Sequence, residues 1–374
     1  MHITPEIPAA RDKLLFTPGP LTTSLTVKHA MLRDAGSWHT DFNALVASIR
    51  SRLLALAGVS REAGWEAILM QGSGTFGVEA VFQTCVPPNG EVVVLANGAY
   101  GERMAQMLKH ARINHRVLRT AEDVPSDPAA LETCLAENPS VTHVAVVHCE
   151  TTTGLLNPIE EIGRITKRYG KTYVVDAMSS FAGIPIDVEA CGIDFLISSA
   201  NKCIEGVPGF SIVLGRRWLL LASEGWARSL SLDLLAQLKG FEKDGKFRYT
   251  PPTHSILGFK QALDELDLEG GISGRNQRYR RNHETLLAGM KGLGFQSYLK
   301  PEVQAPIITS FLFPAWGRFS FDQLYNELSR QGFLIYPGKL TKVDTFRIAN
   351  IGRLFPADME QLVLAIGVAM NQFK

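Results

Sequence analysis

A lysine stands where an apolar segment meets a glycine-rich turn. Lys202 follows the run IDFLISSAN (193–201) and precedes CIEGVPG (203–209). Taken alone, a lysine at the end of a strand is usually a solvated surface residue. Here the small residues around it leave room for a planar ligand, and burial would lower the pKa of its amine. A lysine in such a place can act as a base or bond covalently to a carbonyl carbon.

An aspartate occupies the matching place one strand earlier. Asp176 ends the run TYVVD (172–176) and is followed by AMSS. The carboxyl ends of parallel strands line the ligand crevice of an α/β sheet, so Asp176 and Lys202 are expected to face one site. In isolation, the aspartate could equally cap the segment that follows it.

The segment GSGTFG (72–77) lies directly after a predicted strand and opens a helix. Backbone N–H groups at a helix N-terminus attract an anion, glycines let it approach, and Ser73 and Thr75 add hydroxyl donors. A dinucleotide site would also need an acid at the end of the next strand, but that strand ends in Asn97 and its Glu91 lies at the other end. The loop therefore predicts a phosphate site, or a tight turn whose Ser73 caps the helix.

Together these three features suit one cofactor, pyridoxal 5'-phosphate. Its phosphate needs an anion site, its pyridine nitrogen needs a carboxylate that keeps it protonated, and its aldehyde needs a lysine that holds it as a Schiff base. The loop 72–77, Asp176 and Lys202 supply one of each. The five cysteines have no metal-ligand spacing, so no metal is expected.

The elements that must position these residues follow from the apolar pattern. Seven short runs predict strands, at 67–71, 91–97, 115–120, 143–150, 172–178, 194–200 and 210–215. Helical patterns lie between most of them, which predicts a mainly parallel sheet covered on both faces. No helix separates the last two runs, so the final strand is expected to be antiparallel. Residues 240–254 are interpreted as a loop, and strands at 308–313, 333–338 and 345–350 with helices around them predict a small α/β domain.

Composition narrows the class of protein. The chain has 374 residues, 45% of them hydrophobic, and a formal net charge of +1, which gives no reason to expect nucleic acid or an anionic membrane as a partner. An odd number of scattered cysteines favours reduced thiols. The N-terminal stretch has no long apolar core, and no run reaches the length of a transmembrane helix. A soluble, cytoplasmic protein is therefore expected.

Motifs across nearly the whole chain carry a family resemblance. They are LLFTPGPL (14–21), MQGSGTFGVEA (70–80), NGAYGERM (97–104), HCETTTGLLNP (148–158), VDAMSSF (175–181), SSANKCIEGVPGF (198–210) and TFRIANIG (345–352). In combination they resemble the class V aminotransferases, which are pyridoxal-phosphate enzymes of fold type I. The resemblance implies a large cofactor-binding domain (27–255) with a seven-stranded, mainly parallel sheet. It also implies a small C-terminal domain (256–374) and an N-terminal segment (1–26) that joins the active site and the small domain.

The resemblance implies three central roles. Lys202 would hold the cofactor and move a proton to and from the substrate, and Asp176 would pair with the pyridine nitrogen. Arg347 would clamp the anionic end of the substrate with its forked guanidinium. Gly19, in TPGP (17–20), and the segment SWHTDF (37–42) are expected to line the same pocket.

Further residues are expected at the cofactor. Ser73, Gly74 and Thr75 would hold the phosphate, with Asn201 nearby. Tyr100 would stack on the ring, and Thr151 or Thr152 would bond its phenolic oxygen. Thr250 would reach the phosphate of the neighbouring subunit's cofactor, which implies a homodimer with shared active sites.

Within the family, the exact sequences of the motifs CETTTG, SSANKCIEGVPG and TFRIANIG favour one reaction. The enzyme would move the amino group of 2-aminoethylphosphonate to pyruvate by a ping-pong mechanism, giving phosphonoacetaldehyde and L-alanine in phosphonate degradation. An alanine– or serine–glyoxylate aminotransferase would share the same lysine, aspartate and arginine and stays open as an alternative. A cysteine desulfurase is disfavoured because no cysteine follows Cys203. A further alternative is a binding protein without catalytic activity, which predicts that the purified protein is colourless.

Overall fold

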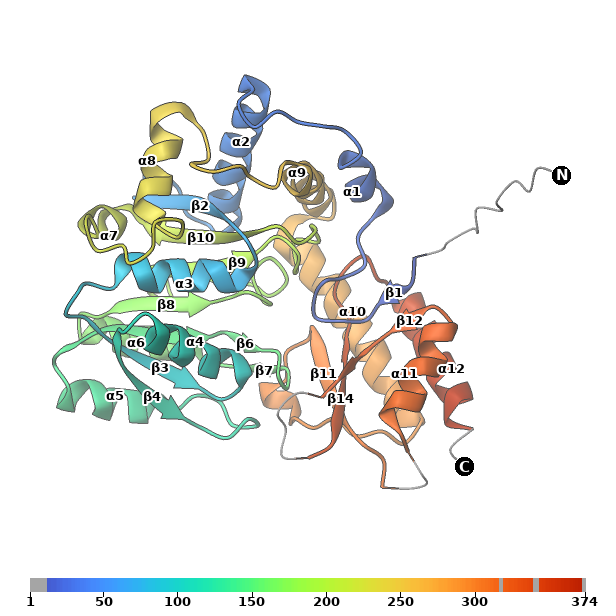
Figure 1. Ribbon diagram of the computed structural model, residues 1–374. Coiled ribbons are helices and arrows are strands. Elements are labelled where there is room, and N and C mark those ends of the chain that lie inside the picture. The colour runs from blue at the N-terminus through green and yellow to red at the C-terminus, as the bar shows by residue number, and fades with distance from the viewer. Residues whose placement is uncertain (1–11, 316–318, 339–342, 372–374) are drawn as a thin grey trace.

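The computed structural model describes residues 12–315, 319–338 and 343–371 (Figure 1). The beginning of the expected N-terminal segment, residues 1–11, lies outside the described residues. No helix in the described part of the chain is long and apolar enough to cross a membrane.

A seven-stranded sheet forms the centre of the larger part of the molecule. Its spatial order is β2 (Trp65–Gln71), β10 (Phe210–Arg216), β9 (Phe195–Ser199), β8 (Thr172–Asp176), β5 (Val141–Val147), β3 (Glu91–Ala96) and β4 (Asn114–Arg119). Six of these strands run in one direction, and β10 runs antiparallel to both of its neighbours, β2 and β9. Neighbouring strands β9 and β10 can be antiparallel because a short loop joins them, whereas a parallel pair needs a longer crossover. The predicted sheet and its reversed last strand are confirmed.

Helices cover both faces of this sheet, and strand alternation shows which face Asp176 takes. The hydroxyl of Tyr173 donates to Ile159 O at 3.0 Å, at the start of α6 (Ile159–Arg168). Ile197 is in register with Asp176 and packs under Gly77 of α3 (Gly74–Cys85), where a Cβ would come within 3.1 Å of it. Side chains alternate along a strand, so Asp176 points away from α6 and toward α3.

The other helices of this part are α1 (Leu25–Ala30), α2 (Thr40–Leu56), α4 (Ala99–His110), α5 (Pro128–Glu137), α7 (Arg217–Ala222), α8 (Leu234–Asp244) and α9 (Thr253–Leu268). α8 shows that the interpretation of 240–254 as a loop is wrong at its beginning. Leu234, Leu238 and Phe241 recur at helical spacing and are buried, which extends the helix past residue 240. Gly245 ends it in the left-handed conformation, with φ 77°.

A smaller sheet, in the order β11 (Ile308–Leu312), β14 (Thr345–Ala349) and β13 (Tyr336–Pro337), lies with α10 (Gly271–Gly292), α11 (Phe321–Arg330) and α12 (Pro356–Met370) (Figure 1). The single strand predicted at 333–338 is divided. β12 (Phe333–Leu334) pairs with β1 (Leu14–Leu15), and the chain changes sheets at buried Ile335. The short elements are β6 (Cys149–Glu150), β7 (Leu155–Leu156) and the 3₁₀ turn Pro301–Val303.

Three buried clusters correspond to this arrangement. The first consists of side chains of the large sheet and of the helices that cover it. The second lies between the small sheet and its helices and includes Phe346 and Ile348 of β14. The third lies between them and consists of Leu21, Cys149, Ile184, Cys203, Tyr279, Ala305, Ile307, Ile308, Ala349 and Ile351. This third cluster joins the loop that carries Lys202 to the small sheet. The domain limits 1–26, 27–255 and 256–374 stay a prediction.

Candidate active site

A pocket of about 270 Å³ opens where the parallel strands β5, β8 and β9 end. In the sheet, β4 lies on one side of β3 and β5 on the other, so the connections after β3 and after β5 run in opposite directions. Ligands of α/β proteins bind in the crevice that forms at such a reversal of strand order. Eight residues predicted for the site line it together: Gly19, Ser73, Gly74, Thr75, Tyr100, Asp176, Asn201 and Lys202. Its other lining residues are Val78, Arg103, Met104, Met107, Val147, Cys149, Met178, Ser179 and Ser199.

Lys202 lies against the N-terminal segment. Its Nζ donates to Pro18 O at 2.6 Å. Gly19 has φ 119°, and a Cβ there would come within 2.6 Å of Lys202 Nζ and 3.0 Å of Asn201 O. Any other residue at position 19 would combine backbone strain with a collision, so the glycine is what lets this segment approach the lysine.

Burial lowers the pKa of the Lys202 amine from its ordinary 10.5 to about 8. Cys203, Asp176 and Cys149 oppose the shift, and the positive charge of Arg347 adds to it. With a pKa of 8, about one amine in ten is neutral at pH 7, against about one in three thousand for an ordinary lysine. The residue is therefore prepared to act as a base or nucleophile near neutral pH.

We expect labelling of Lys202 by acetic anhydride in the cofactor-free protein to reach half its maximal rate near pH 8. Competitive labelling followed by peptide mass spectrometry measures this, with a lysine peptide added as internal standard. A midpoint at or above 10 would contradict a desolvated amine.

Asp176 is buried at the end of β8. Its Oδ1 accepts the N–H of Met178 at 2.9 Å. Burial raises the pKa of Asp176 to about 6, and the negative charge of Glu150 adds to this rise. The hydrogen bond from the Met178 N–H and the positive charges of Lys202 and Arg103 oppose it. The group is a carboxylate above pH 6 and is attracted to a positively charged partner in the pocket.

The N-terminus of α3 is open to the pocket. Ser73 is the N-cap residue, but its side chain makes no capping hydrogen bond and is exposed. The first N–H groups of a helix have no partner within the helix, so this end offers donors to an anion. A Cβ at Gly74 would lie 2.0 Å from Met178 Sδ, so any other residue there would require the Met178 side chain to move. The alternative that Ser73 serves merely to cap the helix is not supported.

A buried carboxylate holds the start of α4, and the sequence analysis gave it no role. Glu150 Oε2 accepts the N–H groups of Tyr100 at 3.1 Å and Gly101 at 3.3 Å. Its Oε1 accepts the N–H and hydroxyl of Thr152, at 3.2 and 2.6 Å. The Thr152 hydroxyl also accepts the Ala99 N–H at 3.0 Å. Both functions of the Thr152 hydroxyl are therefore used within the protein, which leaves Thr151 as the other predicted partner of a cofactor oxygen.

Arg103 is a second residue without a predicted role. Its guanidinium carbon lies 5.0 Å from the centre of the Tyr100 ring, and its Nη1 donates to the Thr75 hydroxyl at 3.3 Å. One positive side chain thus contacts both the expected stacking residue and the expected phosphate loop. Its position three residues after Tyr100 on α4, on the same helix face, was the signal available in the sequence.

Arg347 is buried, with 5% of its surface exposed, so it is not a solvated surface residue. Its Nε donates to Pro337 O at 2.9 Å and its Nη1 to Thr151 O at 2.8 Å. Within the described residues its Nη2 has no hydrogen-bond partner. Burial lowers the pKa of the guanidinium, but Tyr100, Tyr336 and Glu150 oppose this. The backbone contacts fix the side chain and leave donors for an anionic ligand.

Several predicted site residues are not among those that line the pocket: Thr151, Thr152, Thr250, Arg347 and the segment 37–42. Thr250 is exposed outside this pocket, and its carbonyl lies 3.4 Å from Nε2 of Gln71, the last residue of β2. His39 caps α2 by accepting the Asp41 N–H at 3.3 Å and lines a separate surface pocket. In the described chain no group of three or more His, Cys, Asp or Glu side chains is placed to hold a metal ion.

Comparison with known proteins gives close sequence relatives. The sequence profile of the family described as "Aminotransferase class-V" matches residues 24–341. The 2-aminoethylphosphonate–pyruvate transaminase of Syntrophobacter fumaroxidans is 53% identical over 361 residues, covering 96% of this chain and 97% of the relative. The enzyme of the same name from Salmonella typhimurium is 50% identical over 363 residues, covering 96% and 98%.

Solved structures match over almost the whole chain. Pyridoxamine–pyruvate aminotransferase from Mesorhizobium loti gives a TM-score of 0.88 at 24% identity, covering 98% of this chain and 94% of that one. Ureidoglycine–glyoxylate aminotransferase from Bacillus subtilis gives 0.89 at 19% identity, covering 97% and 94%. At such identities these likenesses establish the fold.

Proposed function

The chain belongs to the class V aminotransferases, and on that premise we propose that it transfers the amino group of 2-aminoethylphosphonate to pyruvate. The products are phosphonoacetaldehyde and L-alanine. The observation that carries the proposal is the pocket, which is lined by Lys202, Asp176 and the open N-terminus of α3. The chain that forms it is 50–53% identical to 2-aminoethylphosphonate–pyruvate transaminases. The family depends on pyridoxal phosphate, so the pocket must suit that cofactor.

The residues present fit pyridoxal phosphate. The uncapped α3 terminus with Ser73 and Thr75 would be a phosphate cradle, and Gly74 lets Met178 pack directly against its backbone. Asp176 supplies a buried carboxylate and Lys202 a desolvated amine. When bound, the cofactor supplies an electron-withdrawing ring that stabilises negative charge on the substrate carbon next to nitrogen.

The side chains of this protein then divide the work. Lys202 would hold the cofactor covalently and, when freed by the amino substrate, would move a proton to and from the carbon that bears nitrogen. Asp176 would keep the ring nitrogen protonated. Tyr100 would cover the ring, with its backbone fixed by Glu150 and its ring contacted by Arg103. Thr151 would bond the phenolic oxygen, and Asn201 lines the same pocket as the phosphate cradle.

Arg347 binds the far end of both substrates, with Gly19 completing the pocket beside Lys202. A phosphonate and a carboxylate each offer two oxygens to a forked guanidinium. The two substrates therefore occupy one site in turn, which gives ping-pong kinetics.

The active form is a homodimer with shared sites. Thr250 lies beside the end of β2, exposed and outside the pocket of its own chain, and would contact the cofactor phosphate of a second subunit. The exposed apolar side chains of Tyr249, next to Thr250 in the chain, and Phe76, shortly after β2, are candidates for the covered surface.

Spectroscopy of the purified protein tests the proposed function. We expect absorbance of bound cofactor that changes when 2-aminoethylphosphonate is added and is restored by pyruvate, with alanine formed in equal amount. Fast turnover of alanine with glyoxylate, and no aldehyde from 2-aminoethylphosphonate, would support the alternative aminotransferase instead. A colourless protein that binds no added pyridoxal phosphate would overturn both.

Arg347→Ala should damage substrate use while the cofactor stays bound. Loss of a charge-assisted contact to an anion costs about 1.5–3 kcal/mol, so kcat/KM for both substrates should fall by about 10- to 150-fold. Arg228→Ala is a matched control, because Arg228 also donates to backbone carbonyls, those of Val86 and Pro87, but lies away from the pocket. Loss of cofactor in Arg347→Ala would show a structural role.

A further inference from the structure

The loop that carries Lys202 is fastened immediately after the lysine. The N–H of Glu205 donates to Lys202 O at 2.7 Å, and Glu205 has φ 68°, a conformation that is unfavourable for a residue with a side chain. Arg275 Nη1 donates to Cys203 O. Strained backbone of this kind persists only where surrounding contacts determine it, so the contacts of Glu205 matter for the shape of the loop.

Those contacts come from α10. The Glu205 carboxylate, with 2% of the residue exposed, accepts Arg278 Nη2 at 2.6 Å and the Tyr279 hydroxyl at 2.7 Å, both on Oε1. Arg275 Nη1 lies 3.4 Å from the same oxygen. One helix therefore holds both the backbone and the side chain of the lysine loop.

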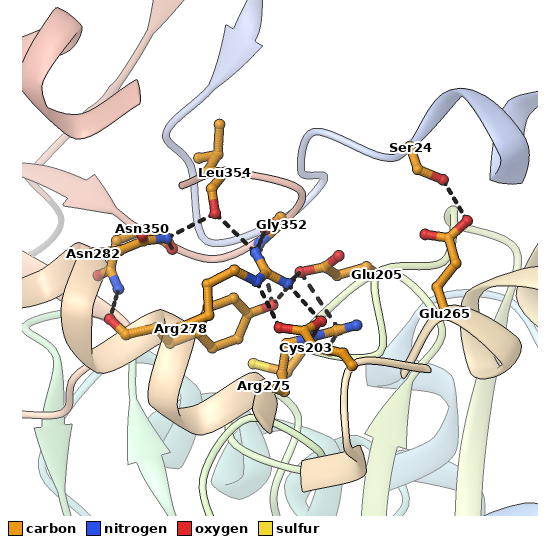
Figure 2. A network of polar contacts seen from close by, with 12 residues as sticks. Ser24, Cys203, Glu205, Glu265, Arg275, Arg278, Asn282, Asn350, Gly352 and Leu354 are labelled. Carbon is orange, nitrogen blue, oxygen red and sulfur yellow. Dashed lines mark hydrogen bonds and ion pairs between the residues drawn. The ribbon is translucent and has the colours of Figure 1, made fainter. Parts of the chain in front are cut away.

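Arg278 and Tyr279 of α10 also contact the segment that follows β14 in the small domain. Arg278 Nη1 donates to Gly352 O at 2.6 Å and Leu354 O at 2.8 Å, and the Tyr279 hydroxyl accepts the Gly352 N–H at 3.2 Å. Figure 2 shows Arg278 between Glu205 and the segment of Gly352 and Leu354. This segment directly follows β14, which carries Arg347.

The polar cluster is electrically balanced. Glu269 accepts Arg275 Nε at 2.8 Å and Arg278 Nε at 2.7 Å, so two carboxylates face two guanidinium groups. Buried ion pairs usually stabilise a fold no more than apolar side chains of the same size. Unlike apolar packing, hydrogen bonds fix the relative orientation of the groups that they join. In this cluster they join α10 to the loop that carries Lys202 on one side and to the segment that follows β14 on the other.

We propose that Arg278 and Tyr279, together with Glu205, are positioning residues that set the distance between Lys202 and Arg347. They bridge the loop that carries Lys202, after β9 of the large sheet, and the segment that follows β14 of the small sheet, the strand that carries Arg347. The proposal rests on the proposed function, because Lys202 and Arg347 must act on the two ends of one small substrate. Misplacement by about 1 Å can cost as much as 100-fold in rate, so a rigid bridge is needed.

Lys202 itself reports this distance. The charged or titratable groups that act on its amine are Cys203 in its own loop, Asp176 of β8, Cys149 of β6 and Arg347 of β14. Of these, only Arg347 lies on the other side of the bridge. If the bridge loosens and Arg347 moves away, the pKa of Lys202 rises.

Two variants weaken the bridge without leaving a buried charge unpaired. Tyr279→Phe removes the one hydroxyl that joins Glu205 to Gly352. The double variant Glu205→Gln with Arg278→Met removes one charge of each sign, so the cluster stays neutral. Matched controls are Tyr173→Phe, whose buried hydroxyl donates to Ile159 O, and the double variant Glu66→Gln with Arg50→Met, which removes a buried ion pair at the far end of β2.

The experiment measures the pH midpoint of Lys202 labelling in cofactor-free protein, melting temperature, and kcat and KM of the holoenzyme. We expect both bridge variants to raise the midpoint, by about half a unit or more in the double variant, and to lower kcat/KM for 2-aminoethylphosphonate by about 10-fold or more. The controls should lower the melting temperature alone. Bridge variants that lose melting temperature but keep the labelling midpoint and kcat/KM within twofold would overturn the proposal.

The labelling midpoint is independent of the reaction. A wild-type protein that fails to use 2-aminoethylphosphonate would refute the proposed function, while a shifted midpoint in Tyr279→Phe would still support the bridge.

Discussion

Lys202→Ala is expected to abolish transamination, with a fall of at least about 10⁴-fold in kcat. Proton transfer by a positioned side chain typically contributes 10²–10⁴-fold, and the variant also loses the covalent attachment of the cofactor. No other amine in the described part of the pocket lining could replace it, because Lys202 is the only lysine there. Steady-state assay with 2-aminoethylphosphonate and pyruvate measures the loss.

The fold should survive this substitution, since the amine of Lys202 is desolvated and, among the residues that the structure describes, donates only to Pro18 O. Lys167→Ala serves as the control. Lys167 pairs with Asp194 before β9, at the opposite end of the sheet. Its removal should leave kcat unchanged. Turnover of Lys202→Ala within tenfold of the wild type would refute the assignment of this residue.

Asp176→Asn should lower kcat by about 10²–10³-fold and weaken retention of the cofactor. Removal of one preorganised electrostatic partner of a reacting group has typical effects of this size. Asparagine keeps an oxygen for the Met178 N–H at 2.9 Å, so the turn after β8 should be preserved and only the charge lost. Spectroscopic titration with pyridoxal phosphate and steady-state kinetics measure the two effects.

Asp194→Asn is the matched control for this variant. Asp194 is also buried and also accepts a backbone N–H, that of Tyr173 at 2.8 Å, but at the far end of the same sheet. It should lower stability without changing the affinity for the cofactor. Equal affinity and rate in Asp176→Asn and the wild type would exclude the carboxylate from the site.

The sequence predicted the parts of the site that depend on strand ends. Asp176 and Lys202 were placed correctly in one pocket because continuous apolar runs define parallel strands, and their carboxyl ends meet at one edge. The loop 72–77 was placed at the pocket because its glycines follow a strand and open a helix, and Gly72 has a local cause, a φ of 106°. Each of these signals lies within a few residues in the chain.

The residues that were missed act over long sequence separations. Glu150 fixes the start of α4 about fifty residues earlier in the chain, which no local pattern records. The segment RNQRYRRNHE (275–284) has the composition of a solvated helix face, yet Arg275 and Arg278 are buried because Glu205 and Glu269 meet them from other elements. Charge pairing across the fold, unlike apolar periodicity, leaves no regular trace in a sequence.

One measurement tests the central claim most directly. The purified protein is incubated with pyridoxal phosphate, reduced with borohydride and digested, and the peptides are mapped by mass spectrometry. A stoichiometric pyridoxyl label on Lys202, displaced when 2-aminoethylphosphonate is added before reduction, is the predicted result. A label distributed over surface lysines, or none on Lys202, would contradict it.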